Sequence, residues 1–79
     1  MIGPCLPLTD LQACRVGYIR EFNLTESHMR RIAPMGLSKG CLVRIVRNSG
    51  RRALIIKAMH TYLAISRTVA QNILIEVAP

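Results

Sequence analysis

The chain has 79 residues, of which 51% are hydrophobic and 4% aromatic, and its 11 Lys and Arg against 4 Asp and Glu give a formal net charge of +7. This is the length of one domain, which we place at 1–79, and it is too short to enclose a deep pocket. Its apolar runs fall short of the roughly 18 residues that span a bilayer, which excludes a membrane-crossing chain, and the positive charge favours an anionic partner.

The N-terminal segment MIGPCLPL lacks the positive start and the long apolar middle of a secretory signal, which predicts a cytosolic protein. Thr9 and Gln12 have the spacing of a capping box and predict a single helical turn. The next residues, CRVGYIREF, are rich in β-branched and aromatic side chains and predict a first strand at 15–22. Gly17 within this strand indicates a bend or a close approach of another backbone.

A short helix is predicted to follow this strand, over 25–33. Thr25 is a suitable N-cap for it, because its hydroxyl can accept a hydrogen bond from the first turn. Pro34 disfavours continuation of the helix, and Gly36 supplies the left-handed residue that ends many helices. Gly40 is then expected to turn the chain into the next strand.

From Gly40 onward the apolar residues alternate or form short runs, which predicts four further strands. These strands are expected at 42–46, 54–58, 61–65 and 73–77. In the hairpin turn RNSGRR, Asn48 and Gly50 are predicted to have positive φ, and Ser66 is expected to cap one short turn before the last strand. The pattern predicts an all-β fold, a small β-barrel of five strands with one short α-helix between the first two strands.

The three cysteines, Cys5, Cys14 and Cys41, are an odd number without a C-x-x-C spacing, so they fit neither a disulfide framework nor a zinc knuckle. We expect reduced thiols that behave mostly as small buried apolar residues. A shared metal site would need His28 or His60 close to them, which the sequence leaves open. No cofactor is indicated.

We expect no enzymatic activity from this chain. Its four acidic residues are scattered, so no carboxylate pair for acid–base catalysis is indicated. His28 and Ser27 are neighbours on a helix start and point about 100° apart, which is incompatible with a triad. The segment GLSKG contains a lysine but lacks the spacing of a phosphate-binding loop.

Two arginine pairs are the clustered cations, Arg30–Arg31 near the end of the predicted helix and Arg51–Arg52 at the hairpin tip. Each pair can be a solvated face, or it can meet acidic side chains or phosphate on a partner through the planar guanidinium. The pair at the hairpin tip can also approach anionic lipid headgroups.

The loop from Gly36 to Gly40 is expected to carry Leu37 and Lys39 outward at a rim. An apolar anchor surrounded by cations suits a protein contact. The alternative is that Leu37 folds back onto its own helix, as a leucine after a helix-ending glycine often does.

The order of these motifs resembles the ferrous iron transport protein A (FeoA) family of small SH3-like barrels. The resemblance covers about residues 7 to 77. It is carried by Arg30–Arg31 followed by MGLSKG, and by LAISRTVAQNILI before the last strand. Pro34, Ala58 and the short RNSGRRA hairpin depart from the pattern of the family.

The resemblance implies a cytoplasmic accessory protein of bacterial ferrous iron uptake, which binds the FeoB permease with its GTPase domain, modulates transport and lies near the inner membrane face through that partner. It does not imply iron binding. The candidate partner-binding residues are Arg30, Arg31, Leu37, Lys39, Arg51 and Arg52. The four arginines among them are also candidates to stimulate GTP hydrolysis by the partner. The oligomeric state and the docking face are left open.

The alternative function is a basic barrel that binds RNA or single-stranded DNA. Such surfaces present stacking rings among their cations. We favour this alternative less, because Tyr18, Phe22 and Tyr62 all lie in predicted strands, where packing is the expected role of the two tyrosines.

Overall fold

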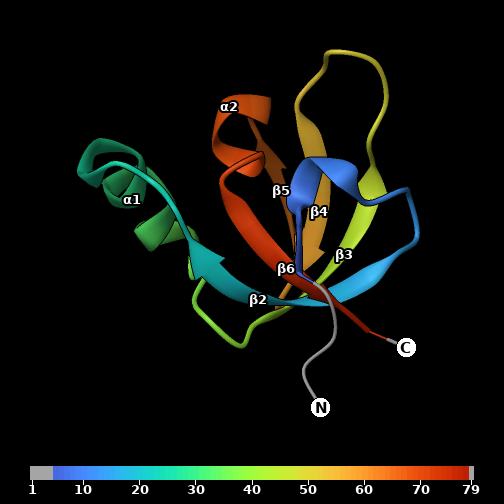
Figure 1. Ribbon diagram of the computed structural model, residues 1–79, viewed down its shortest axis with the longest axis horizontal. Helices are drawn as coiled ribbons and strands as arrows, with labels where there is room; N and C mark the ends of the chain where they lie inside the picture. The colour runs from blue at the N-terminus through green and yellow to red at the C-terminus, as the bar shows by residue number, and fades with distance from the viewer. Residues whose placement is uncertain (1–4, 79) are drawn as a thin grey trace.

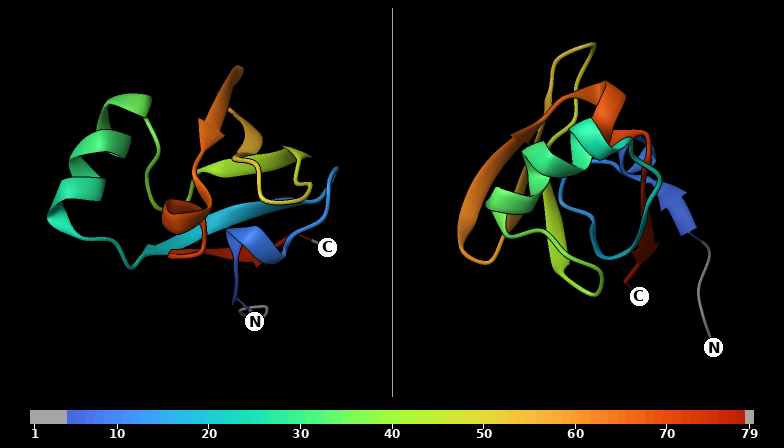
Figure 2. Two further views of the ribbon diagram at one scale, coloured as in Figure 1. Left: turned by 90° about the horizontal axis from the view of Figure 1, so that it is seen from above. Right: turned by 90° about the vertical axis from the view of Figure 1, so that its left-hand side faces the viewer.

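Alternating apolar residues produce a six-stranded antiparallel sheet that curls into a small barrel, seen in the computed structural model, which describes residues 5–78 (Figures 1 and 2). The strands lie in the sheet in the order β1-β6-β2-β3-β4-β5. Their bounds are β1 Cys5–Pro7, β2 Val16–Phe22, β3 Leu42–Arg47, β4 Leu54–Ala58, β5 Thr61–Ile65 and β6 Ile73–Val77. The helices are α1 Glu26–Ile32 and α2 Arg67–Ala70, with 3-10 turns η1 Leu8–Asp10 and η2 Ala33–Met35. None of these helices is long and apolar enough to cross a membrane.

The five predicted strands correspond to β2 to β6, and the small all-β barrel is confirmed. The strand β1 was not predicted, so α1 does not lie between the first two strands of the chain, as expected, but follows the second strand and lies between β2 and β3. β1 is three residues long and pairs with β6 at one edge of the sheet, where Pro7 is tolerated. The turn after Ser66 forms a second short helix, α2, whose first turn is capped by the Ser66 hydroxyl.

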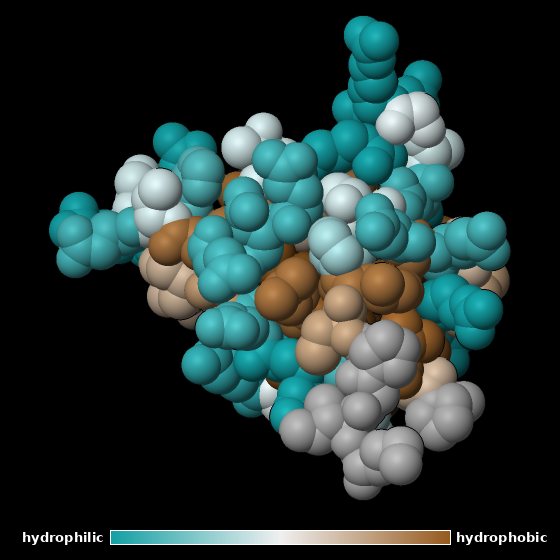
Figure 3. Space-filling view, viewed as in Figure 1, coloured by the Kyte–Doolittle hydropathy of each residue, from teal (hydrophilic) through white to brown (hydrophobic). Residues whose placement is uncertain are grey.

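The core is formed by one face of each long strand. In β3, Val43 and Ile45 are buried, while Leu42, Arg44 and Val46 alternate with them on the outer face. Hydrophilic side chains gather at the β3–β4 hairpin tip, at the top of the face seen in Figure 3, and an apolar band crosses the middle of that face. The alternation of buried and exposed residues along β3 therefore determines which of its side chains can contact a partner.

The helix α1 begins and ends where the sequence predicts. The Thr25 hydroxyl accepts a hydrogen bond from the His28 amide at 3.2 Å. The α-helix ends at Ile32, and Pro34 occupies the following 3-10 turn, where its missing N–H is tolerated. Gly36 then has a φ of 82°, the left-handed conformation that reverses the chain.

Two details of the predicted turns are wrong. The predicted N-terminal turn is present as η1, but Thr9 lies inside it and the turn has no side-chain cap. In the β3–β4 hairpin, Gly50 has a positive φ of 59°, as predicted, but Asn48 does not. The Asn48 amide instead donates to the carbonyl oxygens of Thr9 at 2.9 Å and Leu11 at 2.7 Å, and its oxygen accepts from Arg67 Nη2 at 2.7 Å. Asn48 therefore connects the N-terminal turn, the hairpin and α2.

We expect Asn48→Ala to lower the free energy of unfolding by about 2 kcal/mol, because it removes three part-buried hydrogen bonds and leaves their partners without this amide. Urea unfolding followed by circular dichroism measures the change. Asn23→Ala is the control, because Asn23 is exposed and the same amide is truncated there. Equal losses in the two variants would contradict the connecting role of Asn48.

Candidate protein-docking site

The structure separates the predicted site residues into two groups at opposite ends of the β3–β4 hairpin. Lys39 lies in the loop that leads into the start of β3, whereas Arg51 and Arg52 follow the end of β3 at the hairpin tip. In Figure 1 this tip lies at the top of the molecule and α1, which carries Arg30 and Arg31, lies at the left. One compact partner contact therefore does not combine all of these cations.

The expectation that Leu37 points outward is wrong. Its side chain is 8% exposed and belongs to the core cluster, together with Ile32 of α1. The left-handed Gly36 reverses the chain after η2, so the next residue folds back onto its own helix. Lys39, two residues later, is exposed. The loop therefore presents a cation without the apolar anchor that the sequence suggested.

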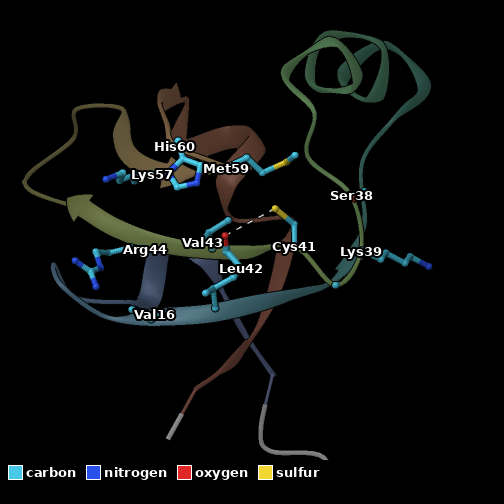
Figure 4. A pocket seen from close by; sticks show the side chains of 11 residues that line it. Val16, Ser38, Lys39, Cys41, Leu42, Val43, Arg44, Lys57, Met59 and His60 are labelled. Atoms are coloured by element: carbon cyan, nitrogen blue, oxygen red, sulfur yellow. Dashed lines mark hydrogen bonds between the residues drawn. The ribbon is translucent and has the colours of Figure 1, made fainter.

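An open groove of about 750 Å³ lies beside this loop (Figure 4). Its walls are the loop 38–41, the start of β3 and the turn that joins β4 to β5. Leu42 and Met59 are among its apolar lining residues, and they are 48% and 69% exposed. The groove thus presents an apolar surface that the sequence analysis did not identify. The exposure of Leu42 could have been predicted, because side chains alternate between the two faces of a strand and the neighbouring Val43 is in the core.

The groove is also lined by positively charged side chains. Arg44 of β3 and Lys57 of β4 are directly opposite one another in the sheet, and both are exposed. Like charges at such a pair are destabilising. The Lys57 ammonium also lies 5.5 Å from the centre of the Tyr62 ring, a cation–π arrangement. Within residues 5–78 the structure shows one ion pair, Arg20 with Glu76 at 3.3 Å, and it involves none of the groove cations.

The turn at the rim of the groove is strained. Met59 and His60 connect β4 to β5 and have φ values of 50° and 67°, whereas Asn-Gly is the preferred pair for a two-residue hairpin turn with two positive φ values. Positive φ is uncommon for residues other than glycine, although His adopts it more often than Met does. A Cβ built on Gly36 would lie 4.0 Å from the Met59 sulfur, so this turn lies next to the end of the helical segment.

We expect the double change Met59→Asn and His60→Gly to raise the free energy of unfolding by about 1 to 2 kcal/mol, because it relieves the strain at two residues. The midpoint of urea unfolding reports this gain. Ala53→Gly is the control: it introduces a glycine at an exposed loop residue that lacks a positive φ, and it should destabilise slightly. An unchanged or lower midpoint for the double variant would show that the turn is not strained.

The cysteines do not match the expectation of burial. Cys5 and Cys14 are exposed and Cys41 is partly exposed; all three are free thiols, as the sequence predicted. In the described part of the chain, no group of three His, Cys, Asp or Glu side chains is placed to share a metal ion. His28 and His60 therefore do not complete a metal site of that kind with them.

Comparisons with known proteins place this geometry in context. The family model described as "FeoA domain" matches residues 6–77. No curated protein matches the chain significantly. The fold is similar to a crystal structure described as iron uptake regulatory protein (FeoA), with 16% identity and a TM-score of 0.88 over 95% of this chain and 100% of that chain.

Two further structures share the fold. A FeoA-like protein from Clostridium acetobutylicum has 17% identity and a TM-score of 0.83, with 95% of this chain and 88% of that chain covered. A manganese-dependent transcriptional repressor has 14% identity and a TM-score of 0.89, with 99% of this chain covered. The match spans 44% of the repressor, so the same barrel is there one part of a longer protein.

Proposed function

The chain belongs to the FeoA domain family, which supports a role in ferrous iron transport, and from this premise we propose that it is an accessory protein that docks on the cytoplasmic part of a FeoB-like permease with a GTPase domain and modulates transport. The observation that carries this proposal is the family match over residues 6–77. Through this partner the protein would act at the inner face of the membrane.

The distribution of exposed cations supports docking through the end of the molecule that carries α1 and the groove. Arg30 and Arg31 lie in the last turn of α1 and are exposed, and Lys39 is exposed in the loop that follows. These cations suit acidic side chains on a protein partner, where a guanidinium can donate two parallel hydrogen bonds to one carboxylate. We assign Arg51 and Arg52, at the far end of the β3–β4 hairpin, no part in this contact.

The proposal is tested by iron uptake and by binding. A strain that lacks this protein is expected to take up reduced iron more slowly, and the wild-type protein to restore uptake. The purified protein is expected to bind the cytoplasmic domain of the permease. Normal uptake in the deletion strain together with no binding would reject the proposed function. GTP turnover by that domain is measured with and without the protein. An unchanged rate would reject the hypothesis that one of the exposed arginines acts on the nucleotide.

A nucleic-acid function remains the second candidate, and one observation favours it more than the sequence did. Tyr18 and Tyr62 are 43% and 63% exposed, so the expectation that they pack within the sheet is wrong. Exposed rings among cations suit the stacking of single-stranded bases. The Lys57 ammonium, however, lies over the Tyr62 ring and competes for one of its faces.

A salt titration separates the two candidates. We expect binding to an oligouridine RNA to be weak and to fall steeply with salt, because phosphate contacts release counterions. The complex with the permease domain is expected to persist at the same salt, because part of its contact is apolar. RNA binding that survives physiological salt, without any binding of the permease domain, would reverse this ranking.

A further inference from the structure

We infer that the groove between the loop 38–41 and the turn at Met59 and His60 binds an extended, acidic segment of a protein, with an apolar side chain of that segment placed between its carboxylates. This inference rests on the proposed function, because it names the part of the molecule that receives the partner. It adds the site and the chemistry of the segment that fits there.

The charge of the groove selects an anionic ligand. Its lining includes Lys39, Arg44 and Lys57, and none of the described residues that line it is acidic. In Figure 4, Lys39 lies on one side of the groove, and Arg44 and Lys57 lie on the other. A ligand that crosses the groove therefore meets positive charge at both ends of its path.

The middle of the groove selects an apolar group. Met59, Cys41 and Leu42 lie between the two sets of cations in Figure 4. The thioether of Met59 is flexible and polarizable, which suits contact with side chains of varied shape. An apolar side chain flanked by carboxylates is complementary to this arrangement, because interface energy concentrates in buried apolar anchors with a charged rim.

Two unfavourable local features converge at this groove. The cations Arg44 and Lys57 are directly opposite one another, and the turn at Met59 and His60 has two non-glycine residues with positive φ. Local features that cost stability in a folded protein are characteristic of functional sites. A carboxylate bound between the two cations would relieve their repulsion, so removal of this unfavourable free energy would strengthen binding.

A polypeptide fits the groove better than a nucleic acid does. Tyr18 and Tyr62, the exposed rings on which bases could stack, do not line the groove. A single-stranded nucleic acid gains much of its affinity from such stacking. The apolar middle of this groove does not stabilise a charged phosphate backbone. Binding of RNA in the groove is therefore an outcome that contradicts the inference.

The test maps binding on the whole protein by the amide resonances of a nitrogen-15-labelled sample. The probe is a short acetylated peptide of alternating Glu and Leu, and the control peptide has Lys in place of Glu. We expect saturable shifts at residues 38–44 and 57–60 with the acidic peptide and none with the basic one. Shifts centred elsewhere, no saturable shift, or competition by oligouridine at the groove would overturn the inference.

A pair of matched variants separates the groove from general charge attraction. Arg44→Glu with Lys57→Glu keeps two like charges opposite one another and inverts their sign, so the fold bears a similar cost. Arg51→Glu with Arg52→Glu changes the net charge equally at the hairpin tip. We expect the first variant to bind the acidic peptide at least about tenfold more weakly and the second to lose less than about threefold. Equal losses would reject the groove as the site.

The same variants distinguish failure of this inference from failure of the proposed function. Peptide binding at the groove without binding of the permease domain would reject the permease as partner and leave the acidic groove in place. Binding of the permease domain that is unchanged by the Arg44 and Lys57 reversals, with no peptide shifts at the groove, would reject the groove and leave the partner in place.

Discussion

Replacing Gly17 by alanine is expected to lower the free energy of unfolding by about 3 kcal/mol, the upper part of the range for overpacked sites. Gly17 is buried in β2, between Val43 of β3 and Val77 of β6. A Cβ at this residue would lie 2.4 Å from Ile75 Cγ2 and 2.8 Å from the carbonyl oxygen of Glu76. The Ile75 side chain can rotate, but the backbone oxygen moves only if β6 moves with it.

The control for this prediction is Gly40→Ala. Gly40 has a φ of 86°, so a side chain there is strained, but no atom lies within 4 Å of the added Cβ. The expected loss is about 1 kcal/mol, the cost of left-handed backbone for a residue other than glycine. Urea unfolding measures the loss in free energy of unfolding for each variant, one caused by a steric clash and the other by backbone strain. A loss at Gly17 no larger than the loss at Gly40 would show that β2 and β6 are not in close backbone contact there.

Neutralising Arg30 and Arg31 is expected to weaken binding to the permease domain about 100-fold, the equivalent of roughly 3 kcal/mol. Both arginines are exposed in the last turn of α1, and the changes Arg30→Gln and Arg31→Gln keep long helix-forming side chains there. The loss arises because acidic groups on the partner are left without their charged donors. Calorimetric titration measures the affinity, and circular dichroism checks that the helix content is retained.

The matched change at the other end of the molecule is Arg51→Gln with Arg52→Gln. It removes the same charge from the hairpin tip, and we expect it to weaken binding less than about threefold, because charge attraction over a distance is largely screened. If both double variants lose affinity equally, the partner recognises net charge, and docking through α1 is wrong.

The elements that the sequence predicts well are those whose signals are local. The strands at 54–58, 61–65 and 73–77 have their predicted bounds, because their apolar runs end at turn residues. The caps at Thr25 and Ser66 are also where the sequence places them, because a hydroxyl three residues before a free amide is a local feature. The same is true of the helix end at Gly36.

The features that the sequence misses depend on distant residues. β1 is three residues long and exists because β6 lies beside it. Asn48 donates hydrogen bonds to carbonyl groups 37 and 39 residues away. The residues that flank it in the sequence indicate only a local turn, so these contacts could not be predicted. The register of Ala58 with Thr61 leaves two residues for the β4–β5 turn, and Met59 and His60 both have positive φ there, although they are not the Asn-Gly pair that indicates such a turn.

The candidate site shows the same division. The exposed cations Arg30, Arg31 and Lys39 could be identified from the sequence, because helix-end and loop cations are usually solvated. The groove could not be identified, because the loop 38–41, β3 and the β4–β5 turn are brought together by sheet pairing. The expected apolar anchor Leu37 is buried, and the apolar contact that we propose for the groove is the exposed Met59 instead.

The most direct test of the docking role is a calorimetric titration of the intact protein into the cytoplasmic domain of the permease at physiological salt. We predict a saturable complex that weakens when Arg30 and Arg31 are neutralised or when the charges of Arg44 and Lys57 are reversed. An absence of any complex with the wild-type protein, under conditions in which both components are folded, would contradict the proposed function.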